Sequence, residues 1–440
     1  MRATSVIQID LSAIDHNMRV IRRMVGPDVS ICCIVKADAY GLGAARLIRR
    51  LETGGVGDAG GGGNGGGGAA LLAVYSTEQA ADLVRGAVTV PVLVLMPVWE
   101  MDRTDELYRA MVSGRLHVTV HGERHLEAVA RIAERFGATV PVHLEIDTGL
   151  TRGGMGLDEA ARVLRRVAGS RWLRLAGLFT HFASPTTDQP STDRQMRQFS
   201  DFLSANEPCI PADCIIHAAS TGAVIRHPRY HAGMVRIGLA WMGYAVETIE
   251  SGEVLPEAAE LQPVVTWASR IVHLREVPVG ASVGYGGRWR ASRASRLALV
   301  PVGYADGYPT ACGGRDGETP GMVAVLVATG PTLRRCWAPV VGAVSMDQIT
   351  IDVTDLPEVG VGTTVELISP DPDAPNHLPT IARRAGLIAH DMLCRLNPRI
   401  RRVHVVRPPL IEPKPAALPG LTALHVEQAA ESRESAQSVG

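Results

Sequence analysis

Residues 29–43 read VSICCIVKADAYGLG, and this stretch is the best starting point for the fold. The continuous apolar run over residues 31–35 is typical of a strand buried on both faces, as in a parallel sheet. Lys36 ends the run, and the glycines that follow favour a tight loop in which backbone approaches another group closely. A lysine in this place either extends its charged end to solvent or serves as a reactive amine.

The same strand-then-helix unit recurs from about residue 10 to 255. LLAVYS leads into the helical-looking TEQAADLVRG, for example, and LHVTV leads into GERHLEAVARIAERFG. Roughly eight such runs predict an α/β fold, a parallel (β/α)8 barrel of the TIM type. Active residues of such barrels follow the C-terminal ends of the strands. Four side chains with useful chemistry fall there: Lys36, Asp147, His181 and Ser220.

The pattern changes after about residue 255. Short alternating runs with Gly and Pro turns predict a mainly β C-terminal domain over residues 256–406, which residues 1–9 join, and a late helix is expected over 378–396. Residues 54–68 contain eleven glycines and are read as a flexible insertion in the barrel. The tail, 407–440, is rich in Pro, Ala, Ser and Glu, and we expect it to be disordered.

Composition bounds the function. A formal net charge of -1 gives no electrostatic support for nucleic-acid or membrane-surface binding. We see no apolar run long enough to span a bilayer and no signal peptide, so we expect a cytoplasmic protein. Seven scattered cysteines suit reduced thiols, and their spacing predicts neither a disulfide framework nor a metal site.

Single residues give weak signals. His181, in GLFTHFASP, is read first as a hydrogen-bonded core histidine, and Arg236, in MVRIGLAWMGY, as half of a buried ion pair. Ser220 and Thr221, in HAASTGA, could cap a helix or bind phosphate at its start. Tyr285, in VGYGGRW, is a loop tyrosine of a kind that usually packs.

Together the segments resemble one family. Nine stretches occur in the order and approximate spacing of the alanine racemases: VKADAYGLG, IDTGLTRGG, GLFTHFAS, HAASTGA, MVRIGLAWMGY, VGYGGRW, PVGYADGYP, VVGAVSMDQITIDV and AGLIAHDMLCR. The resemblance runs from about residue 6 to 406. It implies a pyridoxal 5′-phosphate (PLP) enzyme, an isomerase that racemises a small amino acid, most simply L-alanine to D-alanine. It also implies a cytoplasmic homodimer with active sites at the interface, and D-alanine supply for a bacterial cell wall.

The resemblance assigns roles to individual residues. Lys36 matches the lysine that forms a Schiff base with PLP, and Tyr285 matches the second catalytic base, contributed to the partner subunit's site. Matches to the family's cofactor-binding residues are Tyr40, His181, Ser220, Thr221, Arg236, Gly238, Leu239 and His390. Arg152 and Met346 match residues that receive the substrate carboxylate. No metal is implied.

These residue types suit racemisation. Removing an α-proton requires an electron sink, which PLP provides, and protons must be handled on both faces of a planar carbanion. Lys36 must be neutral to react, and burial lowers a lysine pKa. Tyrosine has a reference pKa near 10 and needs help to act as a base. A chain from Tyr285 through His181 to Arg236 is expected to provide that help.

The chain departs from the family at several positions. Glu145 stands where many members have a carbamylated lysine, and we expect it to contact Arg152, directly or through water. Ser220 replaces a common asparagine, Leu42 a frequent histidine, and His390 a tyrosine that narrows the substrate access. A roomier pocket leaves serine or another small amino acid open as substrate. A barrel-type PLP decarboxylase or lyase, and a weakly active PLP-binding protein, also stay open.

Overall fold

The computed structural model describes residues 4–54, 67–245, 249, 253–329 and 332–406. Most of the glycine-rich stretch 54–68 and all of the tail 407–440 lie outside the described residues, so the predictions of a flexible insertion and a disordered tail stay predictions. Within the described part of the chain, none of the helices has the length and apolar character needed to cross a membrane.

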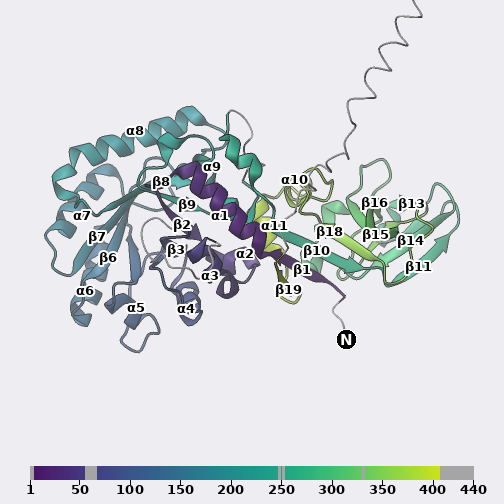
Figure 1. Ribbon diagram of the computed structural model, residues 1–440, viewed down its shortest axis with the longest axis horizontal. Coiled ribbons are helices and arrows are strands. Elements are labelled where there is room, and N and C mark those ends of the chain that lie inside the picture. Colours follow the sequence, from purple (N-terminus) through teal and green to yellow (C-terminus); the bar gives the residue numbers. More distant parts are fainter. Residues whose placement is uncertain (1–3, 55–66, 246–248, 250–252, 330–331, 407–440) are drawn as a thin grey trace, which may run out of the picture. The chain divides into compact units, whose positions relative to one another are not determined.

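The first part of the chain folds into the predicted barrel. Its strands are all parallel and close on themselves in the order β2 to β9, which confirms the (β/α)8 prediction (Figure 1). The strands are β2 (Ser30–Ile34), β3 (Leu71–Val74), β4 (Val92–Val94), β5 (Leu116–Val120), β6 (Val140–Glu145), β7 (Leu173–Phe179), β8 (Ile215–Ser220) and β9 (Met234–Ile237).

Helices surround the barrel strands (Figure 1). They are α1 (Leu11–Val25), α2 (Lys36–Gly41), α3 (Ala44–Thr53), α4 (Thr77–Arg85), α5 (Tyr108–Val112), α6 (Glu123–Phe136), α7 (Leu157–Ala168), α8 (Gln189–Ala205) and α9 (Thr221–Val224). Asp10, Ser76 and Asp188 accept backbone N–H bonds at the starts of α1, α4 and α8, as N-cap residues do. The segment 99–114 has helical composition, but α5 covers only Tyr108–Val112 within it.

The barrel interior has an apolar and a polar half. Cys32, Leu71, Ala73, Leu93 and Met234 form a buried apolar cluster. Across from it, strands β5, β6 and β8 contribute the buried histidines His117, His143 and His217. A polar half inside a barrel core is unusual, because buried polar groups are stable only when they are hydrogen-bonded.

The second part of the chain is mainly β. Its nine-stranded sheet has the order β11-β14-β17-β16-β15-β18-β10-β1-β19, and β12 pairs with β13. The strands are β1 (Val6–Asp10), β10 (Val265–Arg270), β11 (His273–Val277), β12 (Ser282–Val283), β13 (Trp289–Arg290), β14 (Ser295–Val300), β15 (Met322–Thr329), β16 (Thr332–Val341), β17 (Ile349–Asp352), β18 (Thr364–Ile368) and β19 (Arg401–Val405). Among the described residues, short 3₁₀ helices occur in the barrel part, η1 (Glu207–Cys209), η2 (Pro228–Tyr230) and η3 (Leu239–Met242), and in the β-rich part, η5 (Pro256–Glu260), η6 (Tyr285–Gly287), η7 (Tyr304–Asp306) and η8 (Thr310–Cys312).

Strand β1 belongs to this sheet although it opens the chain. It runs antiparallel to β10, with Ile7 opposite Trp267, and parallel to β19, with Ile7 opposite Arg402. Strand β1 is therefore paired along both of its edges, and the side chains of Ile7 and Trp267 are fully buried. The exact boundary between the barrel and the β-rich part, at residues 255 and 256, stays a prediction.

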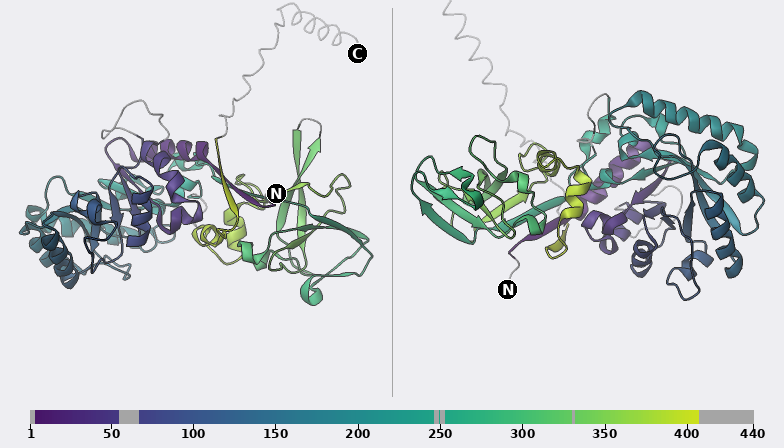
Figure 2. Two further views of the ribbon diagram at one scale, coloured as in Figure 1. Left: turned by 90° about the horizontal axis from the view of Figure 1, so that it is seen from below. Right: turned by 180° about the vertical axis from the view of Figure 1, so that it is seen from behind.

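The helix predicted over residues 378–396 is wrong as a single element. It forms two helices, α10 (Leu378–Arg384) and α11 (Ala389–Arg395), separated at Gly386, whose φ of 66° ends the first helix. Helix α11 lies beside α2 at the barrel mouth (Figures 1 and 2). Arg402 ties the two regions together by donating to the carbonyls of Gly41 at 3.1 Å and Leu396 at 2.7 Å.

Candidate active site

The site begins where β2 ends, at Lys36. The side chain is exposed at the barrel mouth, yet its amine lies deep enough among other atoms for desolvation to lower its pKa, and nearby Arg152 lowers that pKa further. A lowered pKa favours the neutral amine, which is the nucleophilic form. Lys36 thus lies just after the end of β2, where the sequence placed it.

The backbone after Lys36 turns through an uncommon left-handed helical segment. Ala37, Asp38, Ala39 and Tyr40 have φ between 52° and 57°. Left-handed residues other than glycine cost about 1–2 kcal/mol each, and such strain gathers at functional sites. The carboxylate of Asp38 holds the turn by accepting from the Ala44 N–H at 2.7 Å. The sequence predicted an unusual backbone conformation only at the glycines. In the structure the left-handed conformation also includes the four residues before Gly41.

The left-handed turn directs Tyr40 toward β9. Its buried hydroxyl lies so close to Gly238 that a Cβ at position 238 would stand 2.6 Å from it. The Thr221 hydroxyl oxygen accepts the N–H bonds of Gly238 at 3.0 Å and Ala240 at 3.5 Å. Ser220 ends β8 as the residue preceding α9, and Leu239 begins η3. These predicted cofactor-binding residues therefore line one small cradle of hydroxyl and backbone groups.

Arg236, on β9, is buried at the centre of the barrel mouth. It donates to the carbonyls of Thr180 at 2.8 Å and Ala218 at 2.9 Å, and to two imidazoles: Nδ1 of His217 at 2.9 Å and Nδ1 of His181 at 3.0 Å. Burial lowers its pKa to about 10. No carboxylate forms an ion pair with it among the described residues, so the first reading of Arg236 as half of a buried ion pair is wrong.

A line of histidines continues from Arg236 through the polar half of the barrel. Nε2 of His217 lies 3.0 Å from Nδ1 of His143, and Nε2 of His143 lies 2.9 Å from Nδ1 of His117. Gly177 on β7 leaves room for the His143 ring, because a Cβ at position 177 would lie 2.3 Å from Nδ1 of His143.

The guanidinium of Arg236 sets the direction of these bonds. An arginine can only donate, so Nδ1 of His217 must accept, and its Nε2–H then donates to the next ring. The same reasoning puts the proton on Nε2 of His143 and of His117, and on Nε2 of His181. Burial lowers the pKa of His117 to about 4 and that of His181 to about 3, and it lowers the pKa values of His143 and His217 as well. All four rings are therefore neutral near pH 7, with their hydrogen-bond acceptors turned toward Arg236.

Arg152 lies at the same mouth, on the loop after β6. Its charge lowers the pKa values of Lys36, His181 and Arg236, which places it near all three groups. It is exposed, and the described residues offer it no carboxylate within ion-pair distance. A free guanidinium beside a reactive amine is suited to receive a carboxylate ligand.

Glu145 does not form the direct contact with Arg152 that the sequence suggested. Its Oε2 lies 3.0 Å from Nδ1 of His121, a residue that follows β5 on the next strand of the barrel. The direct form of that prediction is wrong because the buried carboxylate meets a nearer imidazole. Sequence reasoning missed His121, His117 and His143. The alternation of 117, 119 and 121 on one strand and of 143 and 145 on the next places them on one inner face.

Helix α11 closes one side of the site with His390. Its ring packs on that of Tyr40, with centroids 5.6 Å apart and planes inclined at 55°. Desolvation, and after it the charge of Lys36, lowers the pKa of His390 to about 4, so the imidazole is neutral. His390 therefore lies where the sequence placed it, against Tyr40 and near Lys36.

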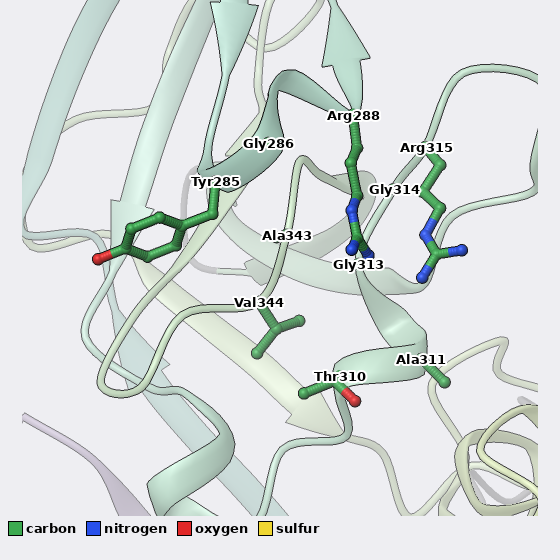
Figure 3. Close-up of a pocket in the computed structure, with 10 residues that line it drawn as sticks. All are labelled: Tyr285, Gly286, Arg288, Thr310, Ala311, Gly313, Gly314, Arg315, Ala343 and Val344. Atoms are coloured by element: carbon green, nitrogen blue, oxygen red, sulfur yellow. The ribbon is translucent and has the colours of Figure 1, made fainter.

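Tyr285 and Met346 lie in the β-rich part, away from these groups. Tyr285 begins the η6 turn and is 76% exposed, and Met346 is 55% exposed. Tyr285 lines a pocket of about 430 Å³. Figure 3 shows its ring turned away from Arg288 and Arg315, which line the same pocket. The predicted contact of Tyr285 with His181 is not formed within one chain, and its supply to a second subunit stays a prediction.

The loop of Met346 is held against the neighbouring turn at Tyr304. The N–H of Tyr304 donates to the Ser345 carbonyl at 3.0 Å, and the N–H of Ala305 to the Met346 carbonyl at 2.9 Å. The approach requires Gly303, since a Cβ there would lie 2.2 Å from the Ser345 carbonyl oxygen. The loop is thus an exposed but well-supported surface feature.

Comparison with known proteins agrees with this geometry. The family model for the alanine racemase N-terminal domain matches residues 9–62 and 63–246, and that for the C-terminal domain matches residues 264–404. The alanine racemase of Desulfovibrio desulfuricans is 33% identical over 399 residues, covering 90% of this chain and 97% of the relative. That of Halothermothrix orenii is 32% identical over 396 residues, covering 90% and 95%.

Solved structures show the same architecture. The alanine racemase from D-cycloserine-producing Streptomyces lavendulae has a TM-score of 0.75 at 26% identity and covers 93% of this chain and 98% of its own. The alanine racemase from Bartonella henselae, which carries covalently bound pyridoxal phosphate, has a TM-score of 0.71 at 24% identity, covers 92% and 100%, and supports the fold alone. Both family models and these relatives show that the chain belongs to the alanine racemase family.

Proposed function

We propose that this chain is a PLP-dependent alanine racemase that works as a homodimer, with Lys36 as one base and the partner subunit's Tyr285 as the other. The observation that carries the proposal is the position of Lys36. A lysine with a lowered pKa stands just after β2, close enough to His181 for its charge to lower the pKa of that ring, and His181 in turn accepts from Arg236. The family indicates which reaction is catalysed, and these residues indicate which groups of this chain would carry it out.

The described residues fit PLP. The Thr221 hydroxyl, the Leu239 backbone and the Tyr40 hydroxyl would hold its phosphate, in a cradle that the missing Cβ of Gly238 keeps open. Lys36 would hold it covalently, and Arg236 would face its ring nitrogen. When bound, the cofactor withdraws electrons from the substrate α-carbon and makes its proton acidic. An arginine that is charged near pH 7 is a donor and would leave that nitrogen without a proton of its own.

Two bases must act on opposite faces of the α-carbon. Once the substrate amine has taken its place on the cofactor, the freed Lys36 amine would take or return the proton on one face, and its lowered pKa brings it closer to neutral pH. The phenol of the partner subunit's Tyr285 serves the other face. His181 accepts from Arg236 through Nδ1, so its Nε2–H is available to donate to that phenol oxygen and to stabilise the phenolate.

Arg152 and the backbone around Met346 would bind the substrate carboxylate. Arg152 already stands beside Lys36 without an ion-pair partner among the described residues, so the substrate need not displace one. Orientation of the carboxylate fixes which face of the α-carbon meets which base, and such positioning contributes strongly to rate.

Alanine is the first substrate candidate, and serine is the second. His390 favours serine as a further substrate because an imidazole is shorter than the tyrosine that it replaces, which leaves more room near Tyr40 and Lys36. A cytoplasmic location and a role in supplying D-alanine for a bacterial cell wall follow from the family and form part of the proposal.

The proposal is tested with purified protein reconstituted with PLP. L-Alanine and L-serine are supplied separately, and formation of each D-enantiomer is followed by chiral chromatography. We expect D-alanine to form fastest, and Lys36→Ala to abolish the reaction. A PLP-loaded protein that racemises neither amino acid would refute the proposal.

A further inference from the structure

His121 and Glu145 make an arrangement that the catalytic proposal does not use. Nε2 of His121 lies 2.8 Å from the Leu95 carbonyl, which can only accept, so Nε2 carries a proton. Nδ1 of the same ring lies 3.0 Å from Oε2 of Glu145. Both groups are largely buried, in the polar half of the barrel near its mouth.

These contacts indicate how the two side chains interact. A neutral Nδ1 facing an ionised carboxylate at 3.0 Å would bring two lone pairs together, which is repulsive. A proton between nitrogen and oxygen turns this contact into a hydrogen bond that joins the end of β5 to the end of β6. The Glu145 carboxyl group is thus engaged by His121 and not by Arg152. This result differs from the expectation drawn from the sequence.

The loop that carries Arg152 folds over this pair. The N–H of Gly154 points at Nδ1 of His121 at 3.2 Å, and the N–H of Met155 donates to the Glu145 carbonyl at 2.9 Å. Glycine is required at the contact. A Cβ on Gly153 would lie 3.2 Å from Oε2 of Glu145, and one on Gly154, which has a φ of 85°, would lie 2.9 Å from Cγ of Glu145.

The other end of the loop is held by its own first residue. The carboxylate of Asp147 accepts from the N–H groups of Gly149 and Leu150, each at 2.9 Å, and of Thr151 at 3.1 Å. Arg152 is thus fixed between an Asp147 turn on one side and the His121–Glu145 pair on the other. The pair reaches the loop near Arg152 from the end of β5, whereas the start of the loop is also held from the end of β7, where the Thr180 hydroxyl lies 2.7 Å from that of Thr148.

We propose that His121 is a positioning residue, which shares a proton with Glu145 and clamps the loop of residues 147–155 so that Arg152 is held beside Lys36. The role assigned to Arg152 rests on the proposed function, whereas the clamp itself does not. A clamped guanidinium loses less entropy when it binds a carboxylate, so the clamp lowers the KM for the amino acid more than it changes kcat.

Two variants disrupt the clamp from opposite sides. His121→Phe keeps a ring but removes both nitrogens, and Gly154→Ala places a methyl against Glu145 without changing any polar group. Gly156→Ala is the matched control. It makes the same chemical change two residues further along, at a φ of -61° with no atom within 4 Å of the new Cβ.

Two measurements are made on the PLP-loaded proteins. The first is hydrogen–deuterium exchange of peptides from residues 147–155, with α7 peptides as an internal reference. We expect the loop to exchange at least about tenfold faster in both disrupting variants and unchanged in Gly156→Ala. The second is steady-state racemisation, in which KM for L-alanine should rise roughly 10- to 100-fold while kcat changes by less than about threefold.

The outcomes separate the two proposals. Faster loop exchange in a protein that racemises no amino acid would refute the proposed function and support the clamp. Racemisation with unchanged loop exchange and unchanged KM in Gly154→Ala would overturn the clamp and leave the proposed function intact. Gly154→Ala decides the matter even if His121→Phe fails to fold, because it alters no buried polar group.

Discussion

Gly177→Ala should lower the stability of the barrel more than most glycine-to-alanine changes do. The new methyl group would clash with His143, the middle ring of the hydrogen-bonded histidines His217, His143 and His117. Gly177 lies opposite His143 across the β6–β7 pair, and its new Cβ would stand 2.3 Å from Nδ1 and 2.6 Å from Cε1 of that ring. The ring cannot move freely. It is 1% exposed and is hydrogen-bonded through both nitrogens, to His117 and to His217.

The expected loss follows from these contacts. Overpacking a core costs about 1–3 kcal/mol, and breaking two buried hydrogen bonds costs about 0.5–1.5 kcal/mol each. Replacing a glycine stiffens the unfolded chain and returns about 0.4–1 kcal/mol. We therefore expect the free energy of unfolding to fall by about 1–6 kcal/mol.

Guanidinium unfolding of the cofactor-free protein, followed by tryptophan fluorescence, measures this loss. Gly169→Ala is the control, because its φ is -86° and its nearest new contact is 3.7 Å, and it should change stability by less than about 1 kcal/mol. In His143→Ala the ring that the new methyl group would meet is absent. Adding Gly177→Ala to that variant should therefore lower the free energy of unfolding only slightly further. An equal loss in both backgrounds, or no loss in either, would refute the reasoning.

Three further predictions concern the same site. His117 has a pKa of about 4 when folded and near 6.5 when unfolded, so the unfolded chain binds more protons between these values and stability falls as the pH drops through that window. Between about pH 4 and 6.5, His117→Asn should reduce the dependence of the free energy of unfolding on pH by about 1.4 kcal/mol per pH unit. An unchanged pH dependence would show that His117 does not have a lowered pKa in the folded protein. Gly238→Ala, whose Cβ would stand 2.6 Å from the Tyr40 hydroxyl, should raise the Kd for PLP by about tenfold or more in a fluorescence titration; wild-type affinity would remove Gly238 from the cradle. His390→Tyr should raise the ratio of kcat/KM for alanine over serine by roughly tenfold, and an unaltered ratio would show that position 390 does not set substrate size.

Much of the fold was readable from hydrophobic pattern alone. The apolar runs at residues 31–35 and 71–74 became β2 and β3 because a parallel barrel strand is buried on both faces. Helix lengths were less predictable. The segments at 99–114 and 378–396 have helical composition, but only part of the first is helical and Gly386 divides the second.

The site was predictable only in part. Lys36, Arg236 and His181 were identified from a resemblance, and the structure brings the last two within 3.0 Å. The hydrogen-bonded histidines and the His121–Glu145 pair were not predicted. They depend on which strands are neighbours and on which side chains of a closed barrel point into its interior. The left-handed turn at Ala37 was also hidden, since non-glycine residues rarely adopt it.

The central claim is that Lys36 of one subunit and the partner subunit's Tyr285 form one active site, and mixing two inactive variants tests it most directly. Lys36→Ala and Tyr285→Phe homodimers are each assayed for D-alanine formation, then dissociated together, reassociated with PLP and assayed again. Random reassociation makes half of the dimers mixed, and each mixed dimer holds one intact site, so about one quarter of wild-type activity should return. No activity from a mixture shown to contain mixed dimers would contradict a site shared between subunits.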